Sequence, residues 1–195
     1  MKQFFKSTAF RCITVLLTVI LICCIYLTLG NALLYVSPEE RLNRAIAKIY
    51  QGERVESEAI TNLTFPSEEG RANILEVRIV TSENHAGDYL VKSQGKDGFQ
   101  NGTVTCWVVI ETDSEHNVKG IGNVAIESNT NQSYISKVKN DFLEQFSATY
   151  NGDPFTTDNG FLASGASYSS NAICNAVNGA VQFVRQYLSD NGGVQ

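Results

Sequence analysis

A stretch with helical hydrophobic spacing is preceded by four small residues, Ser164, Gly165, Ala166 and Ser167, which we call the SGAS segment. A helix N-terminus carries unpaired backbone N–H groups and a partial positive charge, so it attracts anions. Glycine and alanine let the backbone approach a bulky group closely, and a serine hydroxyl can contact a phosphate or be esterified by one. The segment therefore suits a phosphate site, and the simpler alternative is an ordinary helix cap with extra serines.

Ser169 and Ser170 follow the SGAS segment and are further candidate binding residues. A nucleophilic serine is disfavoured, because the chain has no Gly-x-Ser-x-Gly motif and offers no convincing base. The only two histidines, His85 and His116, stand in polar, turn-like contexts and are expected at the surface. The sequence has no Cys-x-x-Cys pair and no Cys/His cluster, so it predicts no metal site.

The N-terminal segment has the pattern of a membrane anchor. Lys2, Lys6 and Arg11 precede the run from Ile13 to Val36, which has no charged residue. As a helix this run would span about 36 Å, against about 30 Å of hydrocarbon. We expect a transmembrane helix with a cytoplasmic N-terminus, since basic flanks stay on that side, and residues 37–195 outside. The alternative is a long signal peptide cleaved after the sequence Gly-Asn-Ala at 30–32.

The cysteines divide between the two parts of the chain. Cys12, Cys23 and Cys24 belong to the membrane segment, where thiols act as small apolar groups. Cys106 and Cys174 belong to the outer part, where an oxidising compartment would permit a disulfide. The sequence leaves their pairing open. The net charge of -5 argues against a nucleic-acid partner.

The outer part reads as an α+β domain. Ser37 and Glu40 form a capping box for a membrane-proximal helix, and residues 52–72 read as a connector. Four strands are expected, then a helix over 135–146 and a last helix from Ser170 to Leu188. The strands are 75–79, 88–93, 103–112 and 118–127, with Trp107 in the core and a possible bulge at Gly120 and Gly122. The chain thus divides into 1–36 (anchor), 37–73 (helix and connector) and 74–195, with a mainly antiparallel sheet.

The sequence SGASYSSNAICNAVNGAV resembles the flavin-attachment segment of the FMN-binding domain family. Members occur in the G subunit of the Rnf ion-translocating complex and the C subunit of sodium-pumping NADH:quinone reductase. The Gly-rich loop and hairpin in residues 87–128 and the helix containing FLEQF also correspond, so the resemblance covers about residues 74–188. The single anchor and the chain length are closest to the Rnf subunit.

The resemblance implies a function and a site. In the family, a flavin transferase joins FMN through its phosphate to the last hydroxyl residue of the motif, which falls on Ser167. Ser164, Gly165, Ala166, Ser169 and Ser170 would surround the cofactor. The protein would then be a membrane-anchored electron-transfer subunit, with the other membrane subunits of an Rnf-type complex as its partners and Na⁺ or H⁺ as the transported ion.

The chain departs from the family at three places. Ser167 stands where threonine is more common, and Phe161 stands where the family usually has an acid. Residues 127–132 read ESNTNQ where the family commonly has ETPGLG. These departures motivate a second hypothesis, a non-redox membrane-anchored binding or assembly domain that has lost the flavin. A pilin-like subunit is a third, disfavoured because the expected Gly before and Glu within the apolar run are missing.

Overall fold

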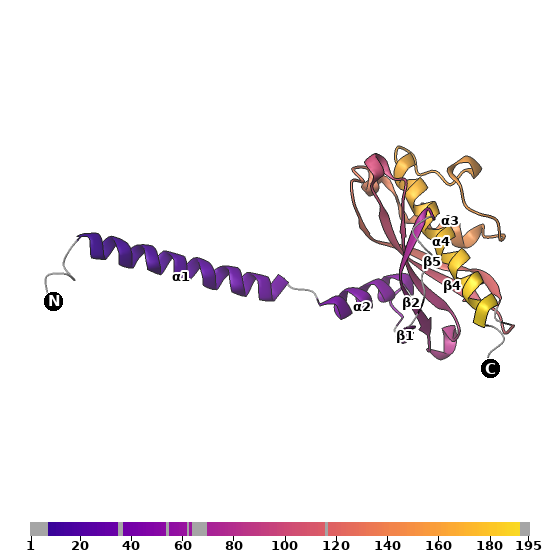
Figure 1. Ribbon diagram of the computed structural model, residues 1–195, viewed down its shortest axis with the longest axis horizontal. Coiled ribbons are helices and arrows are strands. Elements are labelled where there is room, and N and C mark those ends of the chain that lie inside the picture. Colours follow the sequence, from indigo (N-terminus) through magenta and orange to yellow (C-terminus); the bar gives the residue numbers. More distant parts are fainter. Residues whose placement is uncertain are drawn as a thin grey trace. The chain divides into compact units, whose positions relative to one another are not determined.

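The computed structural model describes residues 8–34, 37–53, 55–61, 63, 70–115 and 117–191 (Figure 1). The chain divides into two compact units, residues 1–42 and 43–195. The expectations placed on Lys2, Lys6, Val36 and His116 lie outside the described residues.

Helix α1, Thr8–Leu34, is the main element of the first unit. Its portion from Phe10 to Gly30 is long and apolar enough to cross a membrane, as the sequence predicts. The Thr14 and Thr18 hydroxyls donate to the carbonyls of Phe10 and Thr14, at 2.9 and 2.8 Å. These bonds satisfy polar groups that lipid cannot hydrogen-bond. A signal sequence would have the same length and composition, so both alternatives stay open.

The second unit contains a five-stranded sheet in the order β1-β2-β3-β4-β5, and every neighbouring pair is antiparallel. The α+β class and the antiparallel sheet are therefore confirmed. The register of β4 and β5 gains one residue on β5 between Ile121 and Val124, so a bulge lies at Gly122. The strands are β1 Ser57–Ala59, β2 Ala72–Val80, β3 Tyr89–Gly95, β4 Val104–Thr112 and β5 Val118–Asn129.

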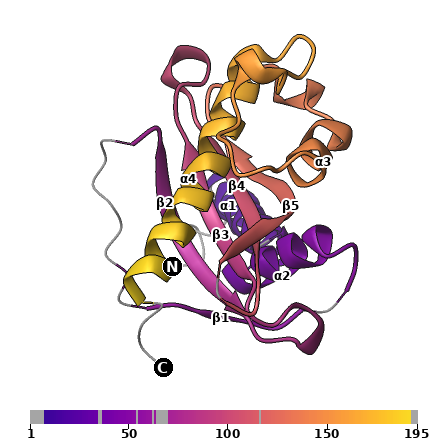
Figure 2. The ribbon, with the colours of Figure 1, turned by 90° about the vertical axis from the view of Figure 1, so that its right-hand side faces the viewer.

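One face of the sheet is covered by α4, Ser167–Asn191, which crosses the strands diagonally (Figure 2). The helix turns small and branched side chains toward the sheet, and they alternate with exposed polar residues at helical spacing. Ile173 and Val177 are fully buried against the even-numbered side chains of β4, such as Val108. The close approach depends on Gly95, where a Cβ would collide with the Ala172 carbonyl.

The helix expected over residues 135–146 is wrong in one respect, because the structure divides it. Residues Ile135–Lys137 form one 3-10 turn, Val138 adopts an extended conformation, and α3 then runs Asn140–Ala148. The helical spacing of the apolar residues is nevertheless explained. Phe142 and Phe146 lie within α3 and are buried, while Ile135 packs on the same core from the separate turn.

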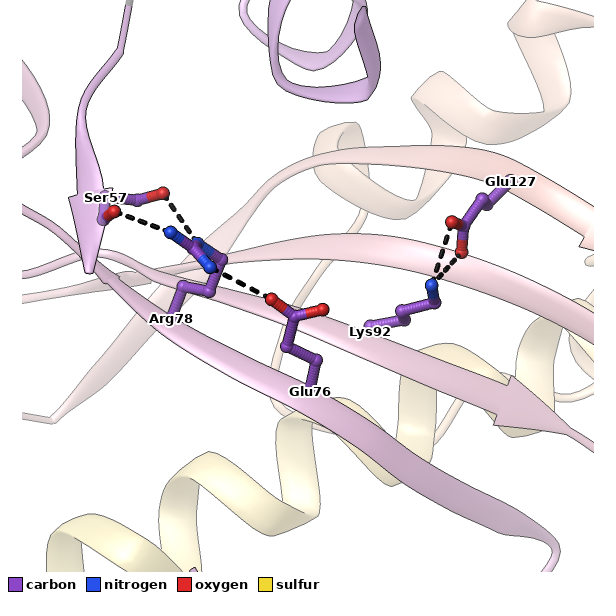
Figure 3. Close-up of polar contacts among 5 residues, drawn as sticks. All are labelled: Ser57, Glu76, Arg78, Lys92 and Glu127. Atoms are coloured by element: carbon purple, nitrogen blue, oxygen red, sulfur yellow. Dashed lines mark hydrogen bonds and ion pairs between the residues drawn. The ribbon is translucent and has the colours of Figure 1, made fainter. Parts of the chain in front are cut away.

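The opposite face of the sheet carries Trp107, which is only 2% exposed and is core, as expected. Lys92 and Glu127 form an ion pair at 2.7 Å (Figure 3). The Lys92 ammonium lies 5.5 Å from the centroid of the Trp107 indole. On β2, Arg78 binds Glu76 at 3.0 Å and donates to the Ser57 carbonyl at 2.8 Å (Figure 3). This last bond fixes β1, a strand that lies in the expected connector.

Helix α2, Pro38–Ile49, begins as the capping-box pattern predicts, since the Glu40 N–H donates to the Ser37 hydroxyl at 3.1 Å. Its C-terminal part belongs to the second unit. Ile46 and Ile49 are buried there, and the Asn123 side chain donates to the Ile49 carbonyl at 2.6 Å. The end of α2 is thereby fixed to β5 on the face opposite α4.

Candidate functional site

The SGAS segment forms a tight turn that leads into α4. Gly165 adopts φ +74°, a left-handed conformation that favours glycine. The Ala166 N–H donates to the Ala163 carbonyl at 2.9 Å, which closes the turn. The Ser170 N–H then donates to the Ala166 carbonyl at 2.9 Å, so Ala166 is the N-cap and Ser167 is the first helical residue. The helix begins three residues earlier than the sequence predicts.

The N-terminus of α4 has no capping side chain. Alanine occupies the N-cap position, and it has no oxygen to accept from the first turn. Among the described residues, nothing accepts from the backbone N–H groups of Ser167, Tyr168 and Ser169. Three donors and the positive end of a 25-residue helix therefore meet at one place. This arrangement is receptive to an anion.

The serine hydroxyls near this helix end fall into two pairs. Ser164 and Ser167 are exposed, so both hydroxyls are open to a modifying enzyme. Ser170 is buried, and its hydroxyl accepts from the Ala163 N–H at 2.9 Å and donates to the Ala166 carbonyl at 3.0 Å. Ser169 is also buried and donates to the Gln132 side chain at 2.8 Å. The two buried hydroxyls hold the turn and the helix start in shape.

Lys137 is a neighbour that the sequence did not single out. A Cβ placed on Gly165 would lie 2.9 Å from the Lys137 amino nitrogen, so the ammonium lies directly against the turn. The same nitrogen lies 4.6 Å from the Tyr134 ring centroid. Both residues come from the stretch just before α3, some 30 positions from the motif, and no sequence spacing connects them with it. A cation thus stands beside the exposed helix end.

Two exposed aromatic rings, those of Tyr168 and Phe99, lie at the start of α4. Tyr168 is 61% exposed and meets Phe99 edge-to-face at 5.7 Å between ring centroids. Phe99 belongs to a loop in which Asp97, Gln100 and Asn101 all have positive φ. Asp and Asn tolerate this conformation, whereas it is costly for Gln100 and persists only where the surroundings enforce it. The loop therefore presents Phe99 in a defined position next to the start of α4.

The stretch that departs from the family, residues 127–132, joins this loop to α4. Gln132 is 5% exposed, and its side chain lies against Gly98 and Gly102, where any Cβ would collide with it. The Gln132 side chain also accepts the Ser169 hydrogen bond at 2.8 Å. Thr130 donates its N–H to the Thr103 carbonyl at 2.9 Å. The altered stretch is thus an ordered support of the site.

Phe161, at the position of the family's acid, serves the core. Its ring stacks on Phe146 at 5.2 Å and meets Phe155 edge-to-face at 4.6 Å. The nearest acid in sequence, Asp158, lies in the 3-10 turn Thr157–Asn159. Asp158 faces a different cavity of about 510 Å³, between α4, the start of β2 and residues 154–158. That cavity does not include the SGAS segment.

The remaining candidate groups have no catalytic arrangement in the described part of the chain. Cys106 and Cys174 are buried free thiols, and burial raises the pKa of each to about 12. No group of three or more His, Cys, Asp or Glu that could hold a metal occurs among the described residues. His85, which the sequence predicts at the surface, is partly exposed, with 31% of its side chain accessible, and its two ring nitrogens lie near the carboxylates of Glu53 and Asp88.

Comparison with known proteins gives no match: no family model, no curated protein and no solved structure is significantly similar to this chain. The fold and the site together define an α+β domain with an exposed, uncapped helix N-terminus and an N-terminal helix suited to a membrane. Flavin attachment at Ser167, which the resemblance of the motif implies, stays a prediction. The local geometry around Ser167 is what supports it.

Proposed function

We propose that this chain is a membrane-anchored flavoprotein that carries FMN on Ser167 and transfers electrons within an Rnf-type ion-translocating complex. The observation that carries the proposal is the exposed Ser167 hydroxyl at the uncapped start of α4. A phosphate esterified to this hydroxyl would lie at the positive end of the helix, where an anion is stabilised by about 0.3–1 kcal/mol or more.

The residues around Ser167 fit a phosphate ester. The free N–H groups of Ser167, Tyr168 and Ser169 can donate to phosphate oxygens, and the Lys137 ammonium can neutralise part of the charge. Gly165 keeps the approach to the turn free of side-chain atoms. Ser169 and Ser170 would contribute indirectly, because their buried hydroxyls fix the backbone that presents these donors.

FMN would supply the electron chemistry, and the chain would supply attachment, position and electrostatics. Attachment matters if the domain lies outside the cytoplasm, where no pool of free FMN refills an empty site. Phe99 and Tyr168 offer aromatic surface next to the attachment point. Partner subunits in the membrane would exchange electrons with the bound flavin, and the complex would couple this flow to the movement of Na⁺ or H⁺.

A non-redox binding or assembly domain of the same fold is the second candidate. One observation in its favour is Gln132, which belongs to residues 127–132, the stretch where the family commonly has Pro and Gly. The buried side chain of Gln132 occupies the space beside Gly98 and Gly102. The packing of Phe161 in the aromatic core, in place of an acid, points the same way. The two candidates differ in one property, the presence of covalent flavin.

The test is in-gel flavin fluorescence of the denatured full chain, made together with a flavin transferase that is shown to act on another substrate. We expect a fluorescent wild-type band that is lost in Ser167→Ala and kept in Ser167→Thr. Ser164→Ala is the matched control, because Ser164 is also exposed at the same turn. A dark wild-type band would overturn the proposal and favour the non-redox domain.

A further inference from the structure

A histidine on the opposite side of the domain stands between two carboxylates. His85 ends the 3-10 turn Glu83–His85 that joins β2 to β3. Its Nε2 lies 3.5 Å from a Glu53 carboxylate oxygen, and its Nδ1 lies 3.6 Å from a carboxylate oxygen of Asp88. A neutral imidazole has one N–H, so it can serve only one of these acceptors, whereas the imidazolium serves both.

We propose that Glu53, His85 and Asp88 form a proton-operated clasp that holds the C-terminal end of α2 on the sheet. We call these three residues the histidine clasp. Protonated His85 joins Glu53, which follows α2, to Asp88, which precedes β3. Loss of the proton removes the positive charge and one N–H donor, so the end of α2 is held less firmly.

The contacts around the clasp show what it holds. The His85 ring lies 4.8 Å from the ring of Tyr50, the residue directly after α2. Asn84 donates to the second oxygen of the Glu53 carboxylate at 3.1 Å. Backbone bonds from Tyr50 to Ile46 and from Gly52 to Ala47 close the helix end. The clasp therefore acts on the last turn of α2, between Ile46 and Glu53.

Among the described residues that line the cavity at His85, the charged side chains other than His85 itself are all acidic. Glu53 follows α2, Asp88 precedes β3 and Glu111 lies in β4, and they line a cavity of about 250 Å³ with Tyr50. Burial, followed by the charge on Asp88, raises the pKa of Tyr50, so its hydroxyl stays neutral. The described part of this cavity therefore favours an imidazolium.

The carboxylates set the lower limit of the clasp. Hydrogen bonds from Asn84 and His85 lower the pKa of Glu53, while burial is the largest cause that raises the pKa of Asp88. Acidification that protonates either carboxylate removes one partner of the imidazolium. The hold that the imidazolium contributes is lost when the pH rises and His85 gives up its proton. The clasp is strongest where both carboxylates are ionised and the imidazole is protonated.

The test is amide hydrogen exchange of the full chain in lipid nanodiscs at pH 5.5 and 7.5, with each rate divided by the intrinsic rate at that pH. We expect the protection of residues 46–53 to fall about threefold to tenfold at the higher pH, since two weak ion pairs are lost. Peptides from β3 and β4 serve as an internal reference for global stability.

Three variants make the test specific. His85→Gln should give low protection of residues 46–53 at both pH values. His116→Gln, the matched control, should keep the wild-type difference. Asn84→Ala should lower protection at both pH values and keep the difference, because it removes a neutral contact to Glu53. Equal wild-type protection at the two pH values, or a retained difference in His85→Gln, would overturn the proposal.

Discussion

At the residue scale, burial separates serines that look alike in the sequence. Ser164, Ser167, Ser169 and Ser170 all lie within seven positions, and each has a hydroxyl that can bind or be modified. The structure leaves the hydroxyls of Ser164 and Ser167 exposed. The hydroxyls of Ser169 and Ser170 are buried and form hydrogen bonds within the protein. Resemblance to a motif can name a residue, but the fold decides which hydroxyl a transferase can reach.

Lys137→Gln should slow flavin attachment about twofold to fivefold, because the variant loses a cation beside an exposed helix end, where one charge contributes about 0.3–1 kcal/mol. The measurement is a time course of in-gel fluorescence with the transferase. Lys139→Gln is the control, an exposed lysine two positions away, whereas the atoms nearest to a Cβ on Gly165 all belong to Lys137. The difference should shrink in high salt, and equal rates for the two variants would contradict the role of Lys137.

The thiols of Cys106 and Cys174 should not react with N-ethylmaleimide in the folded protein at pH 8. With a pKa of about 12, roughly one thiol in ten thousand is ionised, and both are buried. Peptide mass mapping should find both cysteines labelled after denaturation without reductant. Labelling that requires a reductant would show the disulfide that the sequence leaves open.

At the element scale, glycines set the distance between α4 and the sheet. A Cβ on Gly95 would collide with the Ala172 carbonyl and lie 2.6 Å from the Ala176 nitrogen, and both are backbone atoms of α4. Gly179 meets the sheet in the same way, since its Cβ would lie 2.5 Å from the Ala72 side chain. The start of α4, with the SGAS segment, depends on this docking.

Gly95→Ala should therefore destabilise the domain by about 2–3 kcal/mol, the cost of overpacking where backbone cannot yield. Urea unfolding followed by tryptophan emission measures it cleanly, because Trp107 is the only tryptophan and is buried. Gly120→Ala is the control, since its Cβ would meet only a side-chain oxygen, at 3.4 Å. Similar midpoints for the two variants would contradict the close packing.

The sequence predicts the positions of some strands and helices well and of others poorly, and each difference has a physical reason. Strong periodicity locates β3, β4, β5 and α4 closely. Strand β1 has only three residues, which is too short for a visible alternation of apolar and polar side chains. It is held instead by Arg78 of the neighbouring strand β2. The start of α4 is displaced because Ala166, which has no capping oxygen that a sequence pattern could mark, occupies the N-cap position. Lys137 joins the site through tertiary packing alone, which no local pattern contains.

At the scale of the whole molecule, α1 is long and apolar enough to cross a membrane, and an anchored chain can be distinguished from a cleaved one. The full chain should stay with membranes after an alkaline wash, while a variant without residues 1–36 should be soluble, because α1 holds the apolar stretch Phe10–Gly30. Protease added to the outer side should digest residues 43–195 and spare the N-terminus. A mature protein that begins at Leu33 would contradict the anchor and support the cleaved signal peptide.

The order of elements along the chain also has a consequence for biosynthesis. All five strands precede α4, yet α4 covers the apolar face of their sheet. While the chain is made, Val91, Val108 and their neighbours stay uncovered until the last 25-residue helix arrives. That interval is when the domain is most open to aggregation and proteolysis. If Ser167 carries the proposed flavin, its attachment would also have to wait, because Ser167 is in its folded position only after α4 has covered the core.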